Sequence, residues 1–446
     1  MDRNFISEII KKLKIKGCDQ SDVFFIESSS LSSTRRLRKL EMNEHSQNSE
    51  IGIRAIIGKK QSIISTSEID KKNIDVLIDK VVDMANAVPE NEYCGLAENK
   101  DVSCFDIEKF NALDLNDPKI PTLDELDDKA KSLENSALDN KEIINSEGAE
   151  VAWSRTKYLL AGSNGLFQEF SKTNSSFILA VLAGNKNCME REYEYKTKIY
   201  LEELGDFEEV GRLTADRAIK RLNAKKIKTC KTNVIFDARV SPSLINNLAS
   251  ASNASLICRG TSYLKDKLGK KIFNDNINII DDPLMVRQLK SKILDCEGTK
   301  CTKKNLVENG SLKFFFNSLD YSKQLKQNLT GHSTRSVSSL PSPSPSNLYM
   351  ENGSMSKTSM IKSLKNGFLV TELMGSSINM TNGDYSRGAS GFWIENGEIA
   401  FPISEVTIAD NLLNIFEKII PANDLEFNFG TNAPSCLVEN MTVAGI

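Results

Sequence analysis

The chain has 446 residues, a formal net charge of −3, 9 cysteines and only 2 histidines. Its length predicts two or three domains, and 40% hydrophobic with 26% charged residues is typical of a globular protein, which excludes disordered and fibrous classes. The balanced charge gives no reason to expect nucleic-acid binding. The histidines, His45 and His332, lie so far apart in the sequence that no closely spaced histidine pair can hold a metal on one helix.

The sequence carries no signal for export or membrane insertion. Residues 1–16 place apolar and charged residues at helical spacing and lack the apolar core of a signal peptide. The longest apolar run, residues 177–183, is far shorter than the ~20 residues that a membrane span needs. We therefore expect a cytoplasmic protein with no membrane contact, whose cysteines are buried or incidental thiols. A metal site built on Cys296, Cys301 and Cys258 is an alternative that the spacing does not favour.

Apolar periodicity predicts that helices and antiparallel strands alternate in the first half of the chain. Residues 5–13 form an amphipathic helix, which a strand at 22–27 and a meander at 32–64 follow. The basic cluster at 35–39 is expected on a solvated strand or loop of this meander, because no aromatic residue lies among its charges to stack on a base. Ser67 begins a capping-box pattern for the next helix, which Pro89 would end.

The pattern then changes from helix to strand and back. Residues 90–120 read as a loop, and Thr122 begins a helix that reaches about residue 140. Strands follow between 151 and 201, with a hairpin turn at Asn164-Gly165 because both residues tolerate positive φ. An amphipathic helix over 205–226 leads into the second half of the chain.

The second half is predicted to be mostly strand. A strand at 232–238 precedes a helix that Ser241 would cap and that would run to about residue 258. Two further Asn-Gly hairpins, an extended Pro/Ser-rich segment or linker at 336–346, a helix at 408–419 and a strand at 435–443 follow. We expect an α+β fold: a mixed N-terminal domain over 1–225, and a C-terminal domain over 226–446 dominated by antiparallel, barrel-like sheet with a few helices.

The common catalytic motifs are missing. Neither histidine lies near a Gly-x-Ser-x-Gly turn, and no phosphate-binding glycine loop occurs. His332 is interpreted as a backbone-tied loop residue or as a site residue, with the first favoured. The densest polar motif is residues 382–388, which place Asp384, Tyr385, Ser386 and Arg387 between glycines. It fits equally a wide turn whose side chains satisfy backbone groups and a loop that contacts a peptide or anion through Arg387.

Three sequence blocks make the chain recognisable. They are G-F-L-V-T-E-L-M-G at 367–375, N-G-D-Y-S-R-G-A-S-G-F-W-I-E-N-G-E-I at 382–399 and P-S-N-L-Y at 345–349. Together they resemble the TldD/PmbA family, with closer similarity to its PmbA (TldE) branch. Weaker agreement extends to T-G-H at 330–332 and V-E-N-M-T-V-A-G at 438–445, whereas the N-terminal half is less distinctive.

The resemblance implies a cytoplasmic zinc protease made of two kinds of subunit. In this family a TldD-type subunit carries zinc on a helix reading H-E-x-x-x-H, where two imidazoles hold the metal and the glutamate activates water. Because the histidines are at i and i+5, a local widening of the helix is needed to bring them together. A TldE/PmbA-type subunit pairs with it, and the pair degrades unfolded peptides or processes peptide precursors.

The corresponding helix of this chain lacks the metal-binding side chains. Residues 244–259 read LINNLASASNASLICR, with no His, Glu or Asp. The metal positions fall near Ile245, Asn246 and Ser250, whose aliphatic, amide and hydroxyl groups cannot make a zinc site. The resemblance also implies a late cysteine ligand, and Cys436 lies too near the last strand to match it. We expect no metal in this chain and zinc in a TldD-like partner.

These observations give an expected function with two alternatives. The chain is expected to be the non-metal subunit of a TldD/TldE-type protease, holding extended peptide in part by strand addition at sheet edges. Asp384, Tyr385, Ser386 and Arg387, with His332, are expected to line the peptide chamber or to face the partner. One alternative is a homodimeric peptide-binding protein without catalysis. The other is an unrelated hydrolysis that uses Ser386 or a cysteine.

Overall fold

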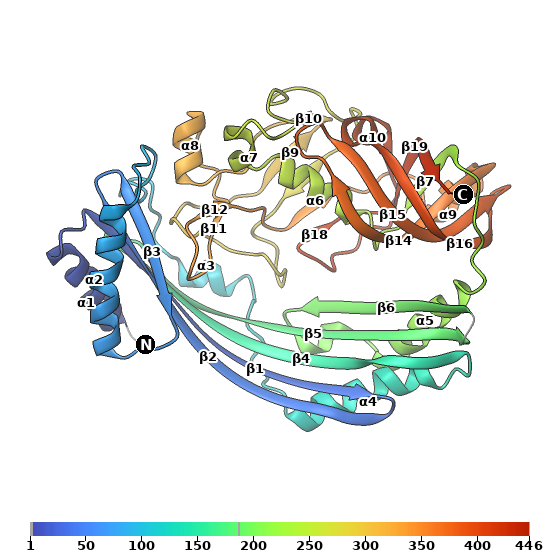
Figure 1. The fold of residues 1–446 in the computed structure, drawn as a ribbon, viewed down its shortest axis with the longest axis horizontal. Coiled ribbons are helices and arrows are strands. Elements are labelled where there is room, and N and C mark those ends of the chain that lie inside the picture. Colours follow the sequence, from blue (N-terminus) through green and yellow to red (C-terminus); the bar gives the residue numbers. More distant parts are fainter. Residues whose placement is uncertain (1–2, 186–187, 446) are drawn as a thin grey trace.

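The computed structural model describes residues 3–185 and 188–445 and has a mixed α and β architecture. A long, curved antiparallel sheet forms the N-terminal part, and the C-terminal part lies on the concave side of this sheet (Figure 1). The expected α+β class, with a barrel in the C-terminal half, is confirmed. The expected boundary near residue 226 falls between α5 (Phe207–Lys220) and β7 (Cys230–Phe236). Among the described residues, no helix is long and apolar enough to cross a membrane.

The N-terminal sheet has six antiparallel strands in the order β3-β2-β1-β4-β5-β6. The strands are longer than their sequence patterns indicate, because the predicted strand at 22–27 continues to Arg36 and the one at 177–183 merges with the preceding hairpin strand. The strand bounds are β1 (Gln20–Arg36), β2 (Lys39–Ile57), β3 (Lys60–Thr66), β4 (Ile143–Gly162), β5 (Phe167–Asn185) and β6 (Cys188–Lys198).

Helices cover one face of this sheet in two groups. Helices α1 (Arg3–Ile15) and α2 (Lys71–Ala87) bury an apolar cluster against one end of the sheet. Helices α4 (Leu123–Leu138) and α5 bury a second cluster, while α3 (Ile107–Asn111) and the short 3-10 helix η1 (Leu201–Leu204) lie in connections. Thr122 caps α4 in a capping box, as predicted. The cap predicted at Ser67 is wrong: Asp70 caps α2, because its carboxylate accepts the amides of Lys72 and Asn73.

The C-terminal half contains a closed five-stranded barrel. Its strands are β7, β14 (Asn366–Ile378), β15 (Asp384–Glu395), β16 (Glu398–Asn411) and β19 (Cys436–Ala444). The pairing of β16 with β19 closes the ring, and β7 with β14 is the parallel pair in it. β17 (Ile419–Pro421) adds to β19 outside the ring. The hairpin predicted at Asn396-Gly397 is confirmed between β15 and β16.

A second, smaller sheet and five short helices complete the C-terminal half. One apolar core joins the barrel, the sheet and α6. The sheet has the order β10-β9-β8-β13-β18. The remaining bounds are β8 (Ile279–Asp281), β9 (Lys304–Glu308), β10 (Ser311–Leu312), β11 (Ser333–Thr334), β12 (Ser342–Pro343), β13 (Leu348–Met350), β18 (Thr431–Asn432), α6 (Pro242–Ala251), α7 (Ala254–Cys258), α8 (Leu319–Leu325), α9 (Lys357–Ser363) and α10 (Leu412–Lys418).

Three sequence predictions for this half need correction. The helix predicted to reach residue 258 is broken into α6 and α7, with Asn253 capping α7. Ser241 does not cap α6, since its hydroxyl donates to the carbonyl of Pro434 instead. The helix predicted over 408–419 begins only at Leu412, because the preceding residues extend β16 and close the barrel.

Buried ion pairs join the two halves of the chain. Asp22 of β1 accepts hydrogen bonds from Arg54 of β2 at 2.7 Å and from Arg335 of the C-terminal half at 2.6 Å. Arg221, at the end of α5, pairs with Glu192 of β6 at 3.2 Å and with Glu372 of β14. Because buried charges are costly when unpaired, these contacts hold the two halves in one arrangement.

Candidate functional site

Three of the predicted site residues line one concave surface at an end of the barrel. The cavity has a volume of about 930 Å³, and it is wide and open. Asp384, Tyr385 and Ser386 at the start of β15 contribute to it, whereas Arg387 is not part of its lining. The complete lining is Ser377, Ile378, Asn379, Met380, Asp384, Tyr385, Ser386, Ala409, Asp410 and Thr442.

Successive side chains of β15 point to opposite faces of the strand, and this sets which of them are buried. Tyr385 is only 1% exposed and belongs to the barrel core, while Asp384 is exposed and Ser386 is half-buried. Burial raises the pKa of the Tyr385 phenol well above its ordinary value, so the phenol stays protonated. Among the described residues its hydroxyl has no hydrogen-bond partner. Ser386 lies opposite Ser377 and Ala409, and neither of these neighbours can act as a general base.

Asp384 and Arg387 both make local hydrogen bonds beside the cavity. Asn382 donates to the Asp384 carboxylate at 2.7 Å, and the Arg387 Nε donates to the Gly375 carbonyl at 2.8 Å. The Arg387 contact satisfies a backbone carbonyl, as the turn interpretation expected, whereas the Asp384 carboxylate accepts from a side chain, and residues 384–388 belong to strand β15. The exposed Asp384 carboxylate and the Ser386 hydroxyl still give the cavity polar groups that can bind a peptide backbone.

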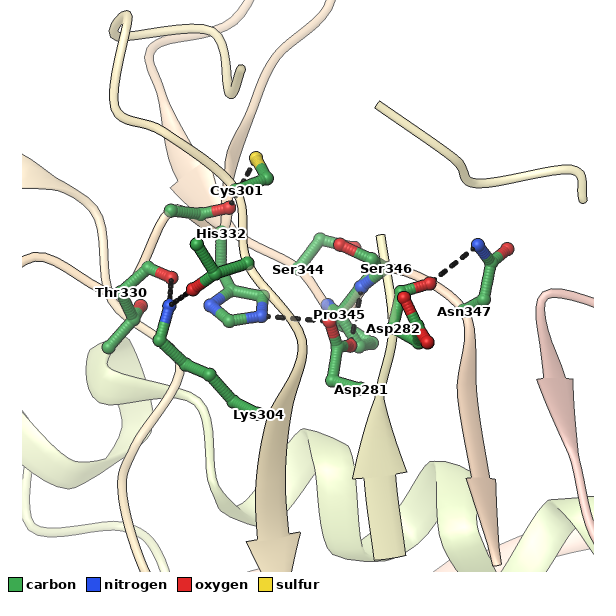
Figure 2. A network of polar contacts seen from close by, with 12 residues as sticks. Asp281, Asp282, Cys301, Lys304, Thr330, His332, Ser344, Pro345, Ser346 and Asn347 are labelled. Atoms are coloured by element: carbon green, nitrogen blue, oxygen red, sulfur yellow. Dashed lines mark hydrogen bonds and ion pairs between the residues drawn. The ribbon is translucent and has the colours of Figure 1, made fainter. Parts of the chain in front are cut away.

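The structure places His332 elsewhere, in the connection before β11, where its ring is buried against the smaller sheet (Figure 2). Its Nε2 lies 3.0 Å from Oδ1 of Asp281, and the other Asp281 oxygen accepts the amide of Ser346 at 2.7 Å. The imidazole packs on the rings of Phe314 and Phe316. Burial lowers the pKa of His332 below its ordinary value, although Asp281 opposes that shift. His332 therefore braces the smaller sheet and does not line the barrel cavity.

The helix that would carry the metal is α6, and its side chains do not fit a zinc ion. Ile245 is fully buried in the apolar core, whereas Asn246 and Ser250 are exposed. On a regular helix, residues five apart point about 140° away from each other. No group at these three positions is a zinc ligand, and the first position faces away from the other two. Within residues 3–185 and 188–445, no three His, Cys, Asp or Glu side chains gather as a metal site requires.

A pocket between the two halves is a feature that the sequence analysis missed. Its volume is about 290 Å³, and it borders Pro242, the first residue of α6. The rings of Tyr195 and Phe429 lie 5.4 Å apart in its wall. Arg239 pairs with Glu192 at 2.7 Å beside it. The pocket thus combines aromatic surface with charged groups, a lining that suits peptide side chains. No sequence signal marks it, because its residues come from separate segments between positions 177 and 433.

Comparisons with known proteins place this geometry in one family. The models of domain 1, the central domain and the C-terminal domain of the PmbA/TldA metallopeptidases match residues 21–85, 116–222 and 229–445. A "Metalloprotease PmbA homolog" of Haemophilus influenzae is 30% identical over 97% of this chain and 94% of its own length.

Solved structures share the complete fold. A protein of Bacteroides thetaiotaomicron superposes with a TM-score of 0.91 at 23% identity, covering 100% of this chain and 99% of its own. TldE of Thermococcus kodakarensis superposes with a TM-score of 0.85 at 21% identity, covering 98% of this chain and 99% of its own. The matching domains and the similarity to PmbA over nearly the whole length show that this chain belongs to the PmbA/TldD metallopeptidase family, on its PmbA (TldE) branch.

Proposed function

We propose that this chain is the non-metal subunit of a two-subunit zinc protease that works in the cytoplasm on unfolded peptides or peptide precursors. In this proposal a TldD-like partner supplies the zinc ion and the general base. This chain supplies part of the surface that holds the peptide. The named metalloproteases among its relatives support the reaction class.

The observation that carries the proposal is the chemistry of α6. The family resemblance assigns its metal ligands to positions that hold Ile245, Asn246 and Ser250 in this chain. A buried aliphatic side chain with an exposed amide and hydroxyl cannot bind zinc or activate a water molecule. A subunit of this kind contributes to proteolysis by positioning the peptide for a second chain.

Two surfaces support the peptide-holding role. The barrel cavity presents Asp384 and Ser386 beside the half-buried apolar side chains of Ile378 and Met380. The pocket between the two halves presents Tyr195 and Phe429 close to Arg239. Both combine apolar contact area with a few polar groups, which is the usual composition of sites that bind peptides and small ligands.

The direct test compares the isolated chain with the two-subunit complex. The chain is purified alone and with the H-E-x-x-x-H protein of the same organism, and both samples are assayed for bound zinc and for cleavage of an unfolded casein-derived peptide. We expect zinc and cleavage only in the complex. Stoichiometric zinc together with cleavage in the isolated chain would refute the proposal, and peptide binding without any partner would favour the homodimeric alternative.

Matched serine variants separate this proposal from a serine hydrolase. Ser386→Ala and Ser377→Ala each remove a hydroxyl from facing positions in the same cavity. We expect both complexes to keep catalytic turnover within a fewfold, because the reacting water belongs to the partner. Loss of turnover in Ser386→Ala alone, with the peptide still bound, would support the serine mechanism instead.

A further inference from the structure

A cavity between the end of α8 and the smaller sheet has a positively charged lining that the proposed function does not use. Its volume is about 480 Å³, a usual size for a ligand site. Three lysines contribute to it: Lys304 at the start of β9, Lys313 just after β10 and Lys326 at the end of α8. The described lining holds no carboxylate, although the whole chain has a net charge of −3. The other lining residues are Leu268, Phe314, Gln327, Asn328, Leu329 and Thr330.

Lys304 is the most enclosed of these lysines. Its side chain is half-buried, whereas Lys313 and Lys326 are exposed. Its ammonium group donates to the Thr302 hydroxyl at 3.0 Å and to the Thr330 carbonyl at 2.8 Å, and Figure 2 shows it directed at Thr330. These neutral oxygens are its only hydrogen-bond partners in the described part of the chain. One of its three N–H groups therefore has no acceptor there.

Two buried carboxylates act on Lys304 without pairing with it. Burial lowers the pKa of the Lys304 ammonium group below its ordinary value, and Asp281 and Asp295 oppose that shift only in part. Asp281 already accepts from His332, and Asp295 accepts backbone amides. An anion that enters the cavity from solvent would supply the counterion that Lys304 lacks.

The two exposed lysines add charge to the same cavity. Lys313 pairs with Glu308 at 3.0 Å, an exposed pair that contributes little stability. The Lys326 side chain makes no ion pair or hydrogen bond within residues 3–185 and 188–445. Lys326 caps α8 in the left-handed conformation with φ at 53°, where glycine or asparagine is the usual residue. The backbone thus gives no reason for a lysine here, and its charge is free to meet a ligand.

Hydrogen bonds hold the walls of the cavity in place. The Asn317 amide nitrogen donates to the Asn328 carbonyl at 2.9 Å, and its amide oxygen accepts the backbone amide of Thr330 at 3.0 Å. The segment after β10 is tied to α7 through Phe316, whose carbonyl accepts the amide of Ala254 at 2.9 Å. A site whose walls are already ordered loses little entropy when a ligand binds.

We propose that this cavity binds carboxylate groups of a peptide, with Lys304 and Lys326 as the groups that contact them. The inference rests on the proposed function only in taking the ligand to be a peptide. The carboxylates can come from acidic side chains or from the C-terminus of the peptide, and both sources offer the same chemistry to the two ammonium groups.

The neutral part of the lining favours a peptide over an inorganic anion. Leu268, which is 39% exposed, and the half-buried Phe314 give apolar surface that an inorganic anion does not use. The side-chain amides of Gln327 and Asn328 can donate to and accept from a peptide backbone. Lysine binds carboxylates as a point charge and not as a planar fork. The site is therefore expected to select peptides by charge and not by one fixed sequence.

Fluorescence anisotropy with the isolated full-length chain tests the site without zinc and without a partner. Three short peptides carry the same neutral dye: a glutamate-rich peptide with an amidated C-terminus, its glutamine counterpart, and that counterpart with a free C-terminal carboxylate. We expect at least one carboxylate-bearing peptide to bind about tenfold more tightly than the amidated glutamine peptide. Which of the two gains affinity identifies acidic side chains or the chain terminus as the source.

Lysine variants locate the binding. Lys326→Asn removes a charge and suits the left-handed backbone, so stability should be kept while the Kd of the preferred peptide rises about two- to fivefold. Lys304→Met keeps the aliphatic stem and should raise this Kd about ten- to hundredfold, because it removes a half-buried charged donor. Lys323→Gln is the matched control, since it removes a lysine of α8 outside the lining and should leave Kd unchanged. If Lys304→Met unfolds, Lys326→Asn decides.

Three results would overturn the proposal. The first is equal affinity for all three peptides. The second is an equal loss of affinity in Lys326→Asn and Lys323→Gln, which would indicate attraction by the general basic surface. The third is displacement of the peptide more strongly by inorganic phosphate than by sodium acetate at the same ionic strength, which would indicate a site for small inorganic anions. Each of them leaves the proposed function standing, because zinc content and cleavage in the two-subunit complex decide that separately.

Discussion

Changing Asp22 to Asn is expected to destabilise the protein strongly, because Asp22 is the only carboxylate that bonds both Arg54 and Arg335 in the described structure. All three side chains are nearly inaccessible, with exposures of 4%, 3% and 1% for Asp22, Arg54 and Arg335. Asparagine keeps the size of the side chain but removes its charge, so that two buried guanidinium groups lose the carboxylate that both of them bond. The two arginines come from opposite halves of the chain, and the loss therefore falls on the junction between them.

The expected loss is about 3–5 kcal/mol in the free energy of unfolding, the usual cost of removing one partner from a buried ion pair. Asp139→Asn is the matched control. Asp139 pairs with Arg38 at the surface, with exposures of 71% and 47%, and its loss should cost less than about 1 kcal/mol. Burial by itself would raise the pKa of Asp22, but Arg335 and Arg54 together hold it below its ordinary value. The stabilisation by Asp22 is therefore present above pH ~4 and is lost as the pH falls through its lowered pKa.

Urea unfolding followed by tryptophan fluorescence checks this prediction in both halves, because Trp153 lies in the N-terminal sheet and Trp393 in the barrel. The urea midpoint of each transition is compared between variants, provided that the slope of the unfolding free energy against urea concentration is unchanged. If the free energy of unfolding of the Asp22→Asn protein at pH 7 lies within about 1 kcal/mol of the wild-type value, as for an ordinary surface substitution, the reasoning is refuted. An equal loss in Asp139→Asn would show that burial does not set the cost.

Four further substitutions test other contacts. Gly52→Ala is expected to lower the free energy of unfolding by about 1–3 kcal/mol, because its Cβ would lie 1.8 Å from the Val337 carbonyl oxygen; an unchanged melting temperature would contradict this. Tyr385→Phe should leave the free energy of unfolding unchanged or raise it slightly, since it removes a hydroxyl that has no hydrogen-bond partner among the described residues. Tyr200→Phe loses a hydrogen bond to Asp114 and should lower the free energy of unfolding in urea by about 1.5–3 kcal/mol. Burial lowers the pKa of His332, so the unfolded state binds more protons than the folded state below pH ~6.5, and the free energy of unfolding decreases as the pH decreases. His332→Gln should make the free energy of unfolding less dependent on pH between pH 7 and 5.5. An unchanged pH dependence would assign the effect to other groups.

The sequence predicted correctly a helix cap and hairpin turns, which depend on residues close together in the chain. Thr122 and Glu125 form the predicted capping box, and the Asn164-Gly165 and Asn396-Gly397 turns lie where positive φ is needed. The cap at Ser67 was wrong because Asp70 offers a competing carboxylate three residues later. The helical pattern at 408–411 was overruled by pairing with both β15 and β19, which no local signal reveals.

The candidate site was less predictable for the same reason. The motif at 382–388 did bring Asp384, Tyr385 and Ser386 to one cavity, since neighbouring strand residues stay together in space. His332 was grouped with them through the family blocks alone, and the fold sends it to Asp281 in another sheet. The pocket at the junction depends on contacts between segments far apart in the chain, such as Tyr195 with Phe429.

The order of the barrel strands has a consequence for how the protein folds during synthesis. β7 is made first among them, yet its two neighbours are β14 and β19, which leave the ribosome more than a hundred residues later. The N-terminal sheet also has one long-range pair, β1 with β4, but all of its strands have been made by residue 198, so it can form while translation continues, apart from the contacts it makes with later segments. The buried face of β7 must wait uncovered until the last strand has emerged. Slow elongation or a stalled ribosome within the barrel region would therefore leave an aggregation-prone chain that depends on chaperones.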